Sequence, residues 1–466
     1  MSGHESWTPD PDGPTARLAA FAAGLRPEHL DARTRRAVRR HLLDTLAACL
    51  AGVGGAEAAI AAAVLGGESH GAVPVPGSAR RWDRLTAAYL AGVAGHGLEI
   101  DDGYRAGSVH PGTVVVPAAL AAAHGTDTDG PGLMAALAVG YEVCTRLAEA
   151  LHPHARARGF HNTPVVGVLA AAAAAGSVLR LDAAAMEHAF GLAASSASGL
   201  FAFLHAGGQV KRLHAGFAAR EGLLAARLAQ GGMTGPRGVL ESPEGYFHAF
   251  RGAPPAGSLA DGLWPLPDAP DLNVTRCYMK PHACCRHLHP AIDALLDGLR
   301  ETGWTASGIE RVDIGSYAIA AKHAATGWAD MASAQLSFPF VMATALRFGA
   351  VQVRHFEAEA LADPVTAALC RRIAVHVDEG CDRAYPAKRS ARVTILARNG
   401  ERWSGHVDDP LGSWTRPLDD ERLHAKVREF AEPRLGRART DALIAAVADL
   451  DALPSAAALA DLTVAG

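Results

Sequence analysis

The chain has 466 residues, a formal net charge of −4, 49% hydrophobic residues and 20% charged residues. This length exceeds the range in which one hydrophobic core keeps growing, so we expect two globular domains, or one large domain with an insertion. A small net charge with interspersed signs excludes the basic surface that nucleic acid or an anionic membrane requires, and neither is expected as a partner.

The cysteines and the amino terminus bear on the cellular compartment. Seven scattered cysteines are an odd number in a long chain, which argues against a secreted disulfide framework. The segment Met1 to Pro14 lacks the basic and then apolar order of a signal peptide. The most apolar window, 165–179, is shorter than the roughly 20 residues that cross a bilayer, so we expect a buried core helix there. These features predict a cytoplasmic protein with reduced thiols.

Helical patterns dominate the first 270 residues. Asp31 is placed to cap a helix in which Val38, Leu42 and later leucines recur every fourth residue, and Gly52 ends the run. Similar Ala/Leu-rich stretches follow, separated by Gly, Pro and Asp, at 84–96, 114–124, 133–151, 165–179, 183–195 and 215–228. We expect this part of the chain to be almost wholly α-helical.

Strand patterns are expected only after the Pro-rich joint at 265–270. Apolar residues alternate at 312–314, 373–377, 393–397 and 403–407. Asn399-Gly400 separates the last two runs and predicts a hairpin, because both positions of its turn favour positive φ. Helical patterns return at 419–430 and 440–450. The fold class predicted is mainly α: a large all-helical domain built from 1–270 and 411–466, with an inserted smaller α+β lid domain at 271–410.

Four stretches carry residues suited to chemistry. The first, 97–112, combines Glu99, Asp101, Asp102 and His110 in a Gly-rich connection between two helices. A carboxylate beside a histidine fixes its tautomer and raises its basicity, as a general base requires. The alternative is that the aspartates cap a helix and His110 merely precedes a turn.

The second and third stretches lie where two helices are expected to begin. His161 opens the most alanine-rich helix, whose first amides favour anions and disfavour a charged imidazole. Lys211, Arg212 and His214 follow a diglycine, and cations at a helix start oppose the macrodipole unless an anionic ligand is bound. The alternatives are a capping histidine and a solvated basic face.

The fourth stretch, 277–289, contains Lys280, Cys284, Cys285, His287 and His289. These residue types are those of a zinc site, but adjacent cysteines rarely both reach one ion and no second ligand pair follows at metal spacing, so we do not expect a metal here. The alternative is Lys280 as an anchor for a carboxylate. Nucleotide-binding templates are missing, so we expect no nucleotide cofactor.

Taken in order, these segments resemble the MmgE/PrpD family, which includes 2-methylcitrate dehydratase, cis-aconitate decarboxylase and an iminodisuccinate epimerase. The resemblance runs over most of the chain. It rests on Leu42 to Gly52, Asp101-Asp102 with His110-Pro-Gly, Gly140-Tyr-Glu-Val, Phe160-His161, Lys211-Arg-Leu-His214 and Lys280-Pro-His-Ala-Cys-Cys.

The resemblance implies a cofactor-free enzyme, usually a homodimer, that transfers protons on a small di- or tricarboxylate. It implies catalytic roles for His110, His161, Lys211, Asp102 and, on a strand, Tyr317. Substrate-binding roles fall to Glu99, Asp101, His214 and Lys280, and no residue is expected to bind a metal.

Three departures concern the substrate. Where the decarboxylase branch of the family has an aspartate, a threonine and a histidine, this chain has Glu99, Gly103 and Cys285. We therefore expect a carbon–oxygen lyase, a dehydratase or hydratase, in preference to a cis-aconitate decarboxylase. An epimerase or isomerase, a decarboxylase of a related acid, and a non-enzymatic carboxylate-binding protein are the alternatives.

Overall fold

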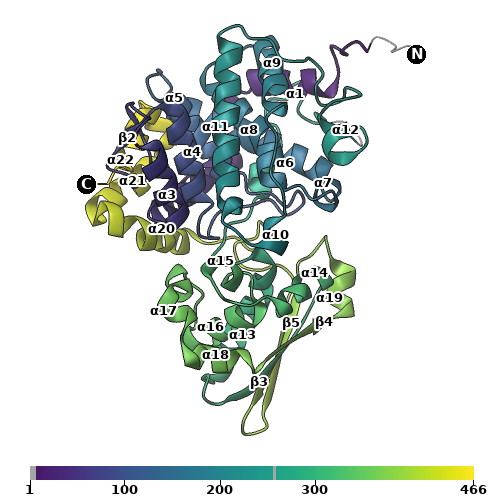
Figure 1. Ribbon diagram of the computed structural model, residues 1–466, viewed down its shortest axis with the longest axis vertical. Helices are drawn as coiled ribbons and strands as arrows, with labels where there is room; N and C mark the ends of the chain where they lie inside the picture. The colour runs from purple at the N-terminus through teal and green to yellow at the C-terminus, as the bar shows by residue number, and fades with distance from the viewer. Residues whose placement is uncertain (1–6, 256–258, 466) are drawn as a thin grey trace. The chain divides into compact units, whose positions relative to one another are not determined.

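The computed structural model describes residues 7–255 and 259–465, and the chain forms two compact units (Figure 1). The first unit comprises Met1–Gly97, Asp101–Cys277 and Asp419–Gly466, and the second comprises Leu98–Ile100 and Tyr278–Leu418. The expectations for residues 1–6, at the start of the chain, lie outside the described residues.

The first unit is built almost entirely from helices. They are α1 (Pro14–Gly24), α2 (Ala32–Gly52), α3 (Ala56–Leu65), α4 (Arg84–Gly95), α5 (Gly112–Ala123), α6 (Gly130–Leu151), α7 (His154–Ala157), α8 (Asn162–Val178), α9 (Ala183–Ala194), α10 (Phe203–Ala206), α11 (Val210–Gln230), α12 (Tyr246–Arg251), α20 (Asp420–Leu435), α21 (Arg437–Ala448) and α22 (Ala456–Leu462).

The alanine-rich helix α8 forms the core of this unit, as the sequence predicts. It packs against α5, α6, α9 and α11, and nearly all of its residues are buried. Small side chains permit this close approach: a Cβ added to Gly222 of α11 would lie 2.4 Å from the Cβ of Ala171 in α8. Burial of that many apolar side chains is the main source of the unit's stability.

Helix α2 begins and ends where the sequence predicts, and it contacts the carboxyl-terminal helices of the first unit. The Asp31 carboxylate accepts a hydrogen bond from the amide of Thr34 at 2.7 Å, which caps the helix. Asp44, fully buried in α2, forms an ion pair of 2.6 Å with Lys426 of α20. The last helices therefore pack on the same core as the first.

One expectation for this unit is wrong. A short antiparallel pair, β1 (Val73–Pro74) with β2 (Arg81–Trp82), lies within the first 270 residues. Each strand has only two residues, and one is a proline, so no alternating pattern marks the pair in the sequence.

The second unit contains a four-stranded sheet in the order β4-β3-β5-β6. Its strands are β3 (Ile309–Ser316), β4 (Ile373–Val377), β5 (Ala391–Ala397) and β6 (Arg402–Val407). Strand β4 is parallel to β3, whereas β5 is antiparallel to both β3 and β6. All four strands coincide with predicted alternating runs.

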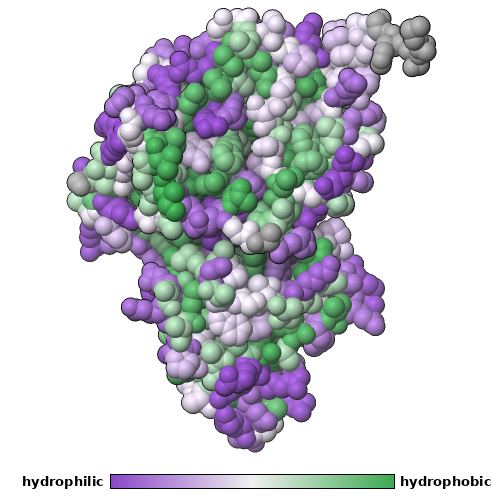
Figure 2. Space-filling model, viewed as in Figure 1, coloured by the Kyte–Doolittle hydropathy of each residue, from purple (hydrophilic) through white to green (hydrophobic). Residues whose placement is uncertain are grey.

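The predicted hairpin between β5 and β6 is confirmed, but its turn is not of the expected type. Gly400 has a φ of +87°, whereas Asn399 is not among the residues with positive φ. The amide of Gly400 bonds to the carbonyl of Ala397 at 2.9 Å, so the loop turns before the glycine and only the glycine is left-handed. This loop is exposed and forms part of a hydrophilic surface (Figure 2).

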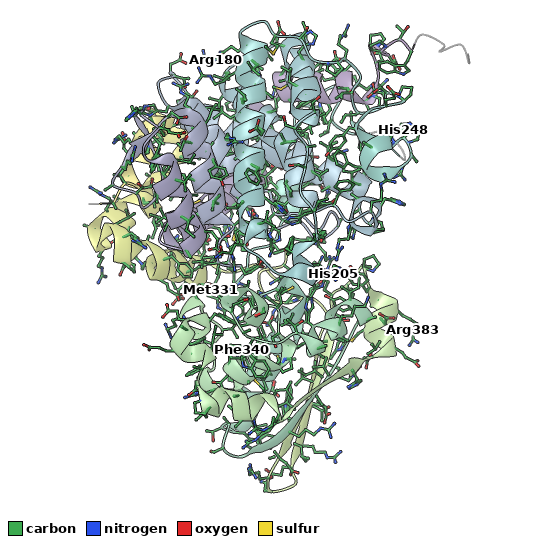
Figure 3. The ribbon with its side chains drawn as sticks, viewed as in Figure 1. Arg180, His205, His248, Met331, Phe340 and Arg383 are labelled. Carbon is green, nitrogen blue, oxygen red and sulfur yellow. The ribbon has the colours of Figure 1, made fainter. Side chains whose placement is uncertain are left out.

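Helices cover the sheet of the second unit. They are α13 (His289–Thr302), α14 (Ala318–Ala321), α15 (Met331–Ala334), α16 (Phe338–Phe348), α17 (Ala358–Leu361), α18 (Pro364–Cys370) and α19 (Glu379–Ala384). Helix α13 packs against β5, β6 and α16. Phe340 of α16 is buried against Trp328 and Phe356, while Arg383 of α19 extends into solvent (Figure 3).

Within the described residues, no single helix is long and apolar enough to cross a membrane. The pair α2 and α3 passes that test by length and composition only when the two are taken together, and they are bent by 77°.

Candidate active site

Five histidines gather in the first unit around the segment that joins α4 to α5. We name His41, His96, His110, His161 and His214 the histidine cluster. The ring centroid of His96 lies 5.1 Å from that of His110 and 5.9 Å from that of His161, which in turn lies 5.2 Å from His214. All except His110 are at least 96% buried. The cluster unites residues from α2, the end of α4, the segment before α5, the N-cap of α8 and the second turn of α11.

His110 is the member with a fixed tautomer and access to solvent. Its Nδ1 lies 2.7 Å from the carbonyl oxygen of Asp102 and 3.1 Å from Oδ2 of Asp101. A carbonyl oxygen only accepts hydrogen bonds, so Nδ1 carries the proton and Nε2 carries the lone pair. The side chain is 16% exposed. His110 thus has the form that a general base needs.

Asp101 and Asp102 hold the histidines in place. His96 Nδ1 donates to Oδ2 of Asp101 at 2.7 Å, and His41 Nδ1 donates to Oδ2 of Asp102 at 2.8 Å. Asp102 also accepts from the hydroxyl of Tyr141 at 2.7 Å and from the amide of Gly112, the first residue of α5, at 2.9 Å. The capping role considered for the aspartates is therefore present at Asp102, together with the bonds to His41 and Tyr141.

His161 and His214 form a second pair. Their Nδ1 atoms lie 2.9 Å apart, so one ring donates and the other accepts. His161 occupies the N-cap position of α8 but makes no side-chain cap hydrogen bond, which rules out the capping alternative in this structure. The rings of Phe201 and Phe203 pack against the pair at 4.9 Å from His161 and 6.0 Å from His214. The pair lies in an apolar environment.

Burial keeps most of the cluster neutral. Desolvation, opposed by Asp101, lowers the pKa of His96 to about 4. Burial and the charge of His96 lower the pKa of His214 to about 4, and the same two causes lower the pKa of His161 well below its usual value. Burial and Asp102 raise the pKa of the Tyr141 phenol. These side chains are therefore neutral at pH 7.

Lys211 brings a positive charge to the cluster. It lies in the first turn of α11, one turn before His214, and its charge lowers the pKa of both His96 and His214. The neighbouring Arg212 is buried and lies 3.3 Å from Glu57 of α3, so it has a structural partner. Of the two cations in this motif, Lys211 is the one near the histidines.

His96 and His110 of the histidine cluster have, together with Asp101, the spacing of a metal site. The donor atoms of His96, Asp101 and His110 all lie within 4.8 Å of one another. However, the bond from His110 Nδ1 to a carbonyl requires a proton on that nitrogen, and a protonated nitrogen cannot ligate a metal. The Nδ1 atoms of both histidines are hydrogen-bonded, that of His96 to Asp101 and that of His110 to the carbonyl of Asp102, so an ion held through Nδ1 would displace these bonds.

The second unit contains two more of the predicted residues, Glu99 and Lys280, as a buried ion pair. The Nζ of Lys280 donates to Oε2 of Glu99 at 2.9 Å, and their side chains are 1% and 8% exposed. Glu99 has a φ of +56°, a conformation that costs a non-glycine residue energy. Glu99 thus combines a strained backbone conformation with a buried ion pair to Lys280.

Tyr317 is fully buried and lies just past the strand on which it was expected. It follows β3 and occupies the N-cap position of α14, so the strand assignment is wrong by one residue. Its hydroxyl lies 2.6 Å from Nδ1 of His287, and its ring stacks on Tyr385 at 4.6 Å. Burial raises the pKa of this phenol far above its usual value.

The cysteines and histidines of 277–289 do not converge on a metal. Within the second unit, all of whose residues are described, no three metal-ligating groups come close enough to share an ion. His289 bonds to the carbonyl of Cys284 at 3.3 Å, and His287 is engaged by Tyr317. The side chains of this motif have separate roles.

Sequence reasoning did not identify three members of the site, His41, His96 and Tyr141. His96 ends a predicted helix and His41 directly precedes the Leu42 to Gly52 motif, so both look like ordinary helix residues. Tyr141 lies in the quoted Gly140-Tyr-Glu-Val motif. Each of the three lies in or beside a segment that the sequence analysis named, but none has a spacing to another polar residue that indicates a catalytic site.

Comparison with known proteins identifies the family of the chain. The MmgE/PrpD N-terminal domain model matches residues 16–258, and the MmgE/PrpD C-terminal domain model matches residues 282–452. The chain belongs to the MmgE/PrpD family.

Full-length relatives within this family are similar at low identity. A cis-aconitate decarboxylase-like protein, oryM, of Aspergillus oryzae is 29% identical, covering 90% of each chain. The cis-aconitate decarboxylase of Aspergillus terreus is 26% identical, covering 97% of this chain and 96% of the relative. The human cis-aconitate decarboxylase is 26% identical over 96% of this chain and 94% of its own.

Proposed function

We propose that the chain is a cofactor-free lyase that acts on a small di- or tricarboxylic acid by acid–base proton transfer. The observation that carries the proposal is the state of His110, whose Nδ1–H is held by the carbonyl of Asp102 and by Asp101, leaving a basic Nε2 on the most exposed ring of the cluster. Family membership and relatives named for decarboxylation of a tricarboxylate support the substrate class.

In this proposal His110 removes a proton from the carbon next to a substrate carboxylate. Asp101, 3.1 Å from Nδ1, stabilises the imidazolium that forms, as the aspartate of a catalytic triad does. A positioned base of this kind contributes roughly 10²- to 10⁴-fold in rate.

Lys211 stabilises the negative charge that develops on the carboxylate as the proton leaves. Its effect on the pKa values of His96 and His214 is evidence that it lies within electrostatic reach of the cluster. A fixed cation among buried groups is worth more than one in water, because there is little solvent to screen it.

The proton that His110 takes is the proposed source of the proton for the departing hydroxide. The imidazolium of His110 becomes neutral again as it gives this proton, so hydroxide leaves as water and the base returns to its starting form. His161 and His214, which are neutral near pH 7, are proposed to orient the departing group by hydrogen bonds.

We favour dehydration or hydration, a carbon–oxygen lyase reaction, because Glu99, Gly103 and Cys285 depart from the decarboxylase branch. In the second unit the carboxylate of Glu99 pairs with Lys280 and partly neutralises the positive charge that the lysine presents to a substrate. Decarboxylation is the second candidate, and the names of the relatives favour it.

A substrate panel tests the proposal. Purified protein would be incubated in deuterated buffer with citrate, 2-methylcitrate, cis-aconitate and amino-dicarboxylates, and followed by proton NMR together with release of carbon dioxide. Formation or hydration of a carbon–carbon double bond without carbon dioxide supports the dehydratase. Carbon dioxide from cis-aconitate supports the decarboxylase, exchange without elimination supports an epimerase, and no reaction with any acid contradicts the proposal.

The remaining expectations belong to the same proposal and have their own tests. Tyr317 and Lys280 are proposed to contact the substrate, the second unit to act as a lid, and the chain to form a homodimer in the cytoplasm. Turnover of Tyr317→Phe, the mass of the native protein by light scattering, and localisation of a tagged chain test them separately.

A further inference from the structure

A cavity of about 740 Å³ opens at the surface of the first unit. It is lined by the segment after α3, the end of β2 with the start of α4, the end of α5, and the last turns of α11. Its volume is in the range of sites that bind small molecules. Every residue of its wall belongs to the first unit and is described by the structure, so one unit alone forms this cavity.

Helices α4, α5 and α11 separate this cavity from the histidine cluster. The three helices pack against one another (Figure 1). On α4, Arg84 of the cavity is the first residue and His96 of the cluster follows the last one. On α11, Lys211 lies in the first turn and Arg227 of the cavity in the last, while His124 of the cavity follows α5. The length of α4, roughly 18 Å, therefore lies between the cavity and the cluster.

Arg84 and Arg227 bring two positive charges to the wall of the cavity. Within the part of the chain that the structure describes, neither guanidinium group has a hydrogen bond or an ion pair. A Cβ added to Gly125, which also lines the cavity, would lie 3.1 Å from Nη2 of Arg84, so this guanidinium group lies against the turn after α5. Burial and the charge of Arg227 lower the pKa of Arg84, which shows that the two cations are close enough to repel each other. Such a pair attracts an anion.

The carboxylates near these arginines are already engaged. Asp83, the acid of the wall, caps α4: it accepts hydrogen bonds from the hydroxyl of Ser69 and from two main-chain amides of the first turn. Asp461, whose charge reaches His124, forms an ion pair of 2.8 Å with Arg81. Neither carboxylate therefore neutralises the two arginines of the cavity.

Two ring nitrogens of the wall also lack partners among the described residues. The indole Nε1 of Trp82, a residue that is 3% exposed, and Nδ1 of His124 are both buried without a hydrogen bond. An indole N–H only donates. A buried N–H without an acceptor is rarer than an unfilled lone pair, so the proton of the His124 ring is assigned to Nε2, which is then a donor. Apart from Asp83, the polar side chains of the wall thus present donors without acceptors.

We propose that this cavity binds a small oxyanion with two or more negative charges, a di- or tricarboxylate or a phosphate, between the guanidinium groups of Arg84 and Arg227. Planar guanidinium groups donate paired hydrogen bonds to the oxygens of carboxylates and phosphates. The bound anion offsets the repulsion between the two arginines, and Nε2–H of His124 is a further donor to it. The site does not depend on the proposed lyase reaction, because none of these residues belongs to the histidine cluster.

Chemical modification of arginines tests the site in the native protein. Phenylglyoxal would be applied at constant ionic strength, alone and with citrate or inorganic phosphate, and the modified arginines located by peptide mapping. One of the two anions should slow modification of Arg84 and Arg227 severalfold, and the anion that does so identifies the class of ligand. The exposed Arg300 of α13 should react at the same rate throughout. Modification of Arg84 and Arg227 that neither anion slows would overturn the proposal.

Replacement of the arginines tests their contribution to affinity. By isothermal titration calorimetry with the protecting anion, the double variant Arg84→Gln, Arg227→Gln should raise Kd by about tenfold or more, because both charge-assisted donors are lost. Arg300→Gln is the matched control and should keep the Kd of the parent. Lys211→Gln, beside the histidine cluster, should also keep it, which distinguishes this site from anion binding at the cluster.

Two results of the titration would contradict the proposal. They are an equal Kd in the parent and the double arginine variant, and loss of binding in Lys211→Gln in place of that variant. If the double variant does not fold, the protection of Arg84 and Arg227 in the parent remains decisive.

Discussion

The Nδ1 of His110 donates to the carbonyl oxygen of Asp102 at 2.7 Å, while the side chain of that aspartate is engaged by His41, Tyr141 and Gly112. A single residue thus sets the tautomer of the proposed base through its main chain and anchors α2, α5 and α6 through its carboxylate. Asp102 thus contributes both to the proposed catalysis and to the stability of the fold. Activity and stability therefore have to be measured separately.

Replacement of His110 tests the chemistry. His110→Asn should lower turnover by about 10²- to 10⁴-fold, because the general base is lost. Its melting temperature should stay close to that of the parent, since the side chain lies at the edge of the buried cluster. Turnover on the substrate found in the panel is the measurement, and His188→Asn, a half-buried histidine of α9, is the control. A His110→Asn enzyme within a few-fold of the parent would disprove the assignment.

Replacement of Asp102 tests the packing. Asp102→Ala removes the acceptor for three donors, two of them buried side chains, and should lower the free energy of unfolding by about 3–5 kcal/mol. Asp102→Asn keeps one acceptor oxygen and should cost less. Urea denaturation measures both. The exposed N-cap Asp182→Ala should cost only about 1 kcal/mol, and an Asp102→Ala loss no larger than this would show that the three bonds contribute little.

The elements of the fold were predictable because local sequence determines them. Asp31 and Gly52 mark the ends of α2, and alternating residues mark all four strands of the second unit. The pair β1 and β2 was not predictable, since its two-residue strands have no period and depend on tertiary context. The hairpin turn at Asn399-Gly400 was predicted as a two-residue turn with positive φ at both positions. The chain instead forms a longer loop in which only Gly400 has positive φ, and the sequence does not distinguish the two loops.

The site was predictable only in part. The residue types of 97–112 indicated acid–base chemistry, but no spacing revealed that His41, 61 positions before Asp102, is its partner. The ion pair of Glu99 with Lys280 spans 181 positions and was likewise not foreseen. Contacts between distant segments depend on packing, which a single sequence does not contain.

The pH dependence of stability tests the neutral histidines. An unfolded histidine has a pKa of about 6.5, whereas His96 and His214 have pKa values of about 4 in the folded protein. Between these values the unfolded chain binds more protons, so their contribution is complete above pH 6.5 and is lost as the pH falls towards 4. Each should contribute a slope of up to about 1.4 kcal/mol per pH unit.

Denaturant unfolding from pH 4.5 to 8 measures that slope. His96→Gln should flatten it by the share of one histidine, whereas His376→Gln, exposed on β4, should leave it unchanged. Equal slopes in the parent and His96→Gln would mean that His96 is not held neutral by the fold.

Metal removal tests the triad of His96, Asp101 and His110. Dialysis against a strong chelator should leave turnover within about twofold, because the proton on His110 Nδ1 is required by its carbonyl bond. Elemental analysis of the dialysed protein is the control. Loss of turnover that is restored by a divalent metal would make these three residues a ligand set and replace the acid–base proposal.

The ion pair of Lys280 and Glu99 makes the last prediction. Either Lys280→Met or Glu99→Gln leaves one charge buried without its 2.9 Å partner and should cost about 3–5 kcal/mol, whereas the double variant should lose less than the sum. Glu99→Gly also removes the strain of a φ of +56° and should lose less than Glu99→Ala, which keeps the strain and loses the same carboxylate. Urea denaturation measures all five variants.

The same variants separate structure from substrate binding. If Lys280 binds a substrate carboxylate, Lys280→Met should raise KM by tenfold or more at a temperature where the variant is folded, and Lys280→Arg should restore part of that loss. A purely structural lysine would leave KM unchanged in the folded fraction, because only the amount of active enzyme would fall. Lys388→Met, which changes an exposed lysine of the same unit, should alter neither KM nor stability by a comparable amount.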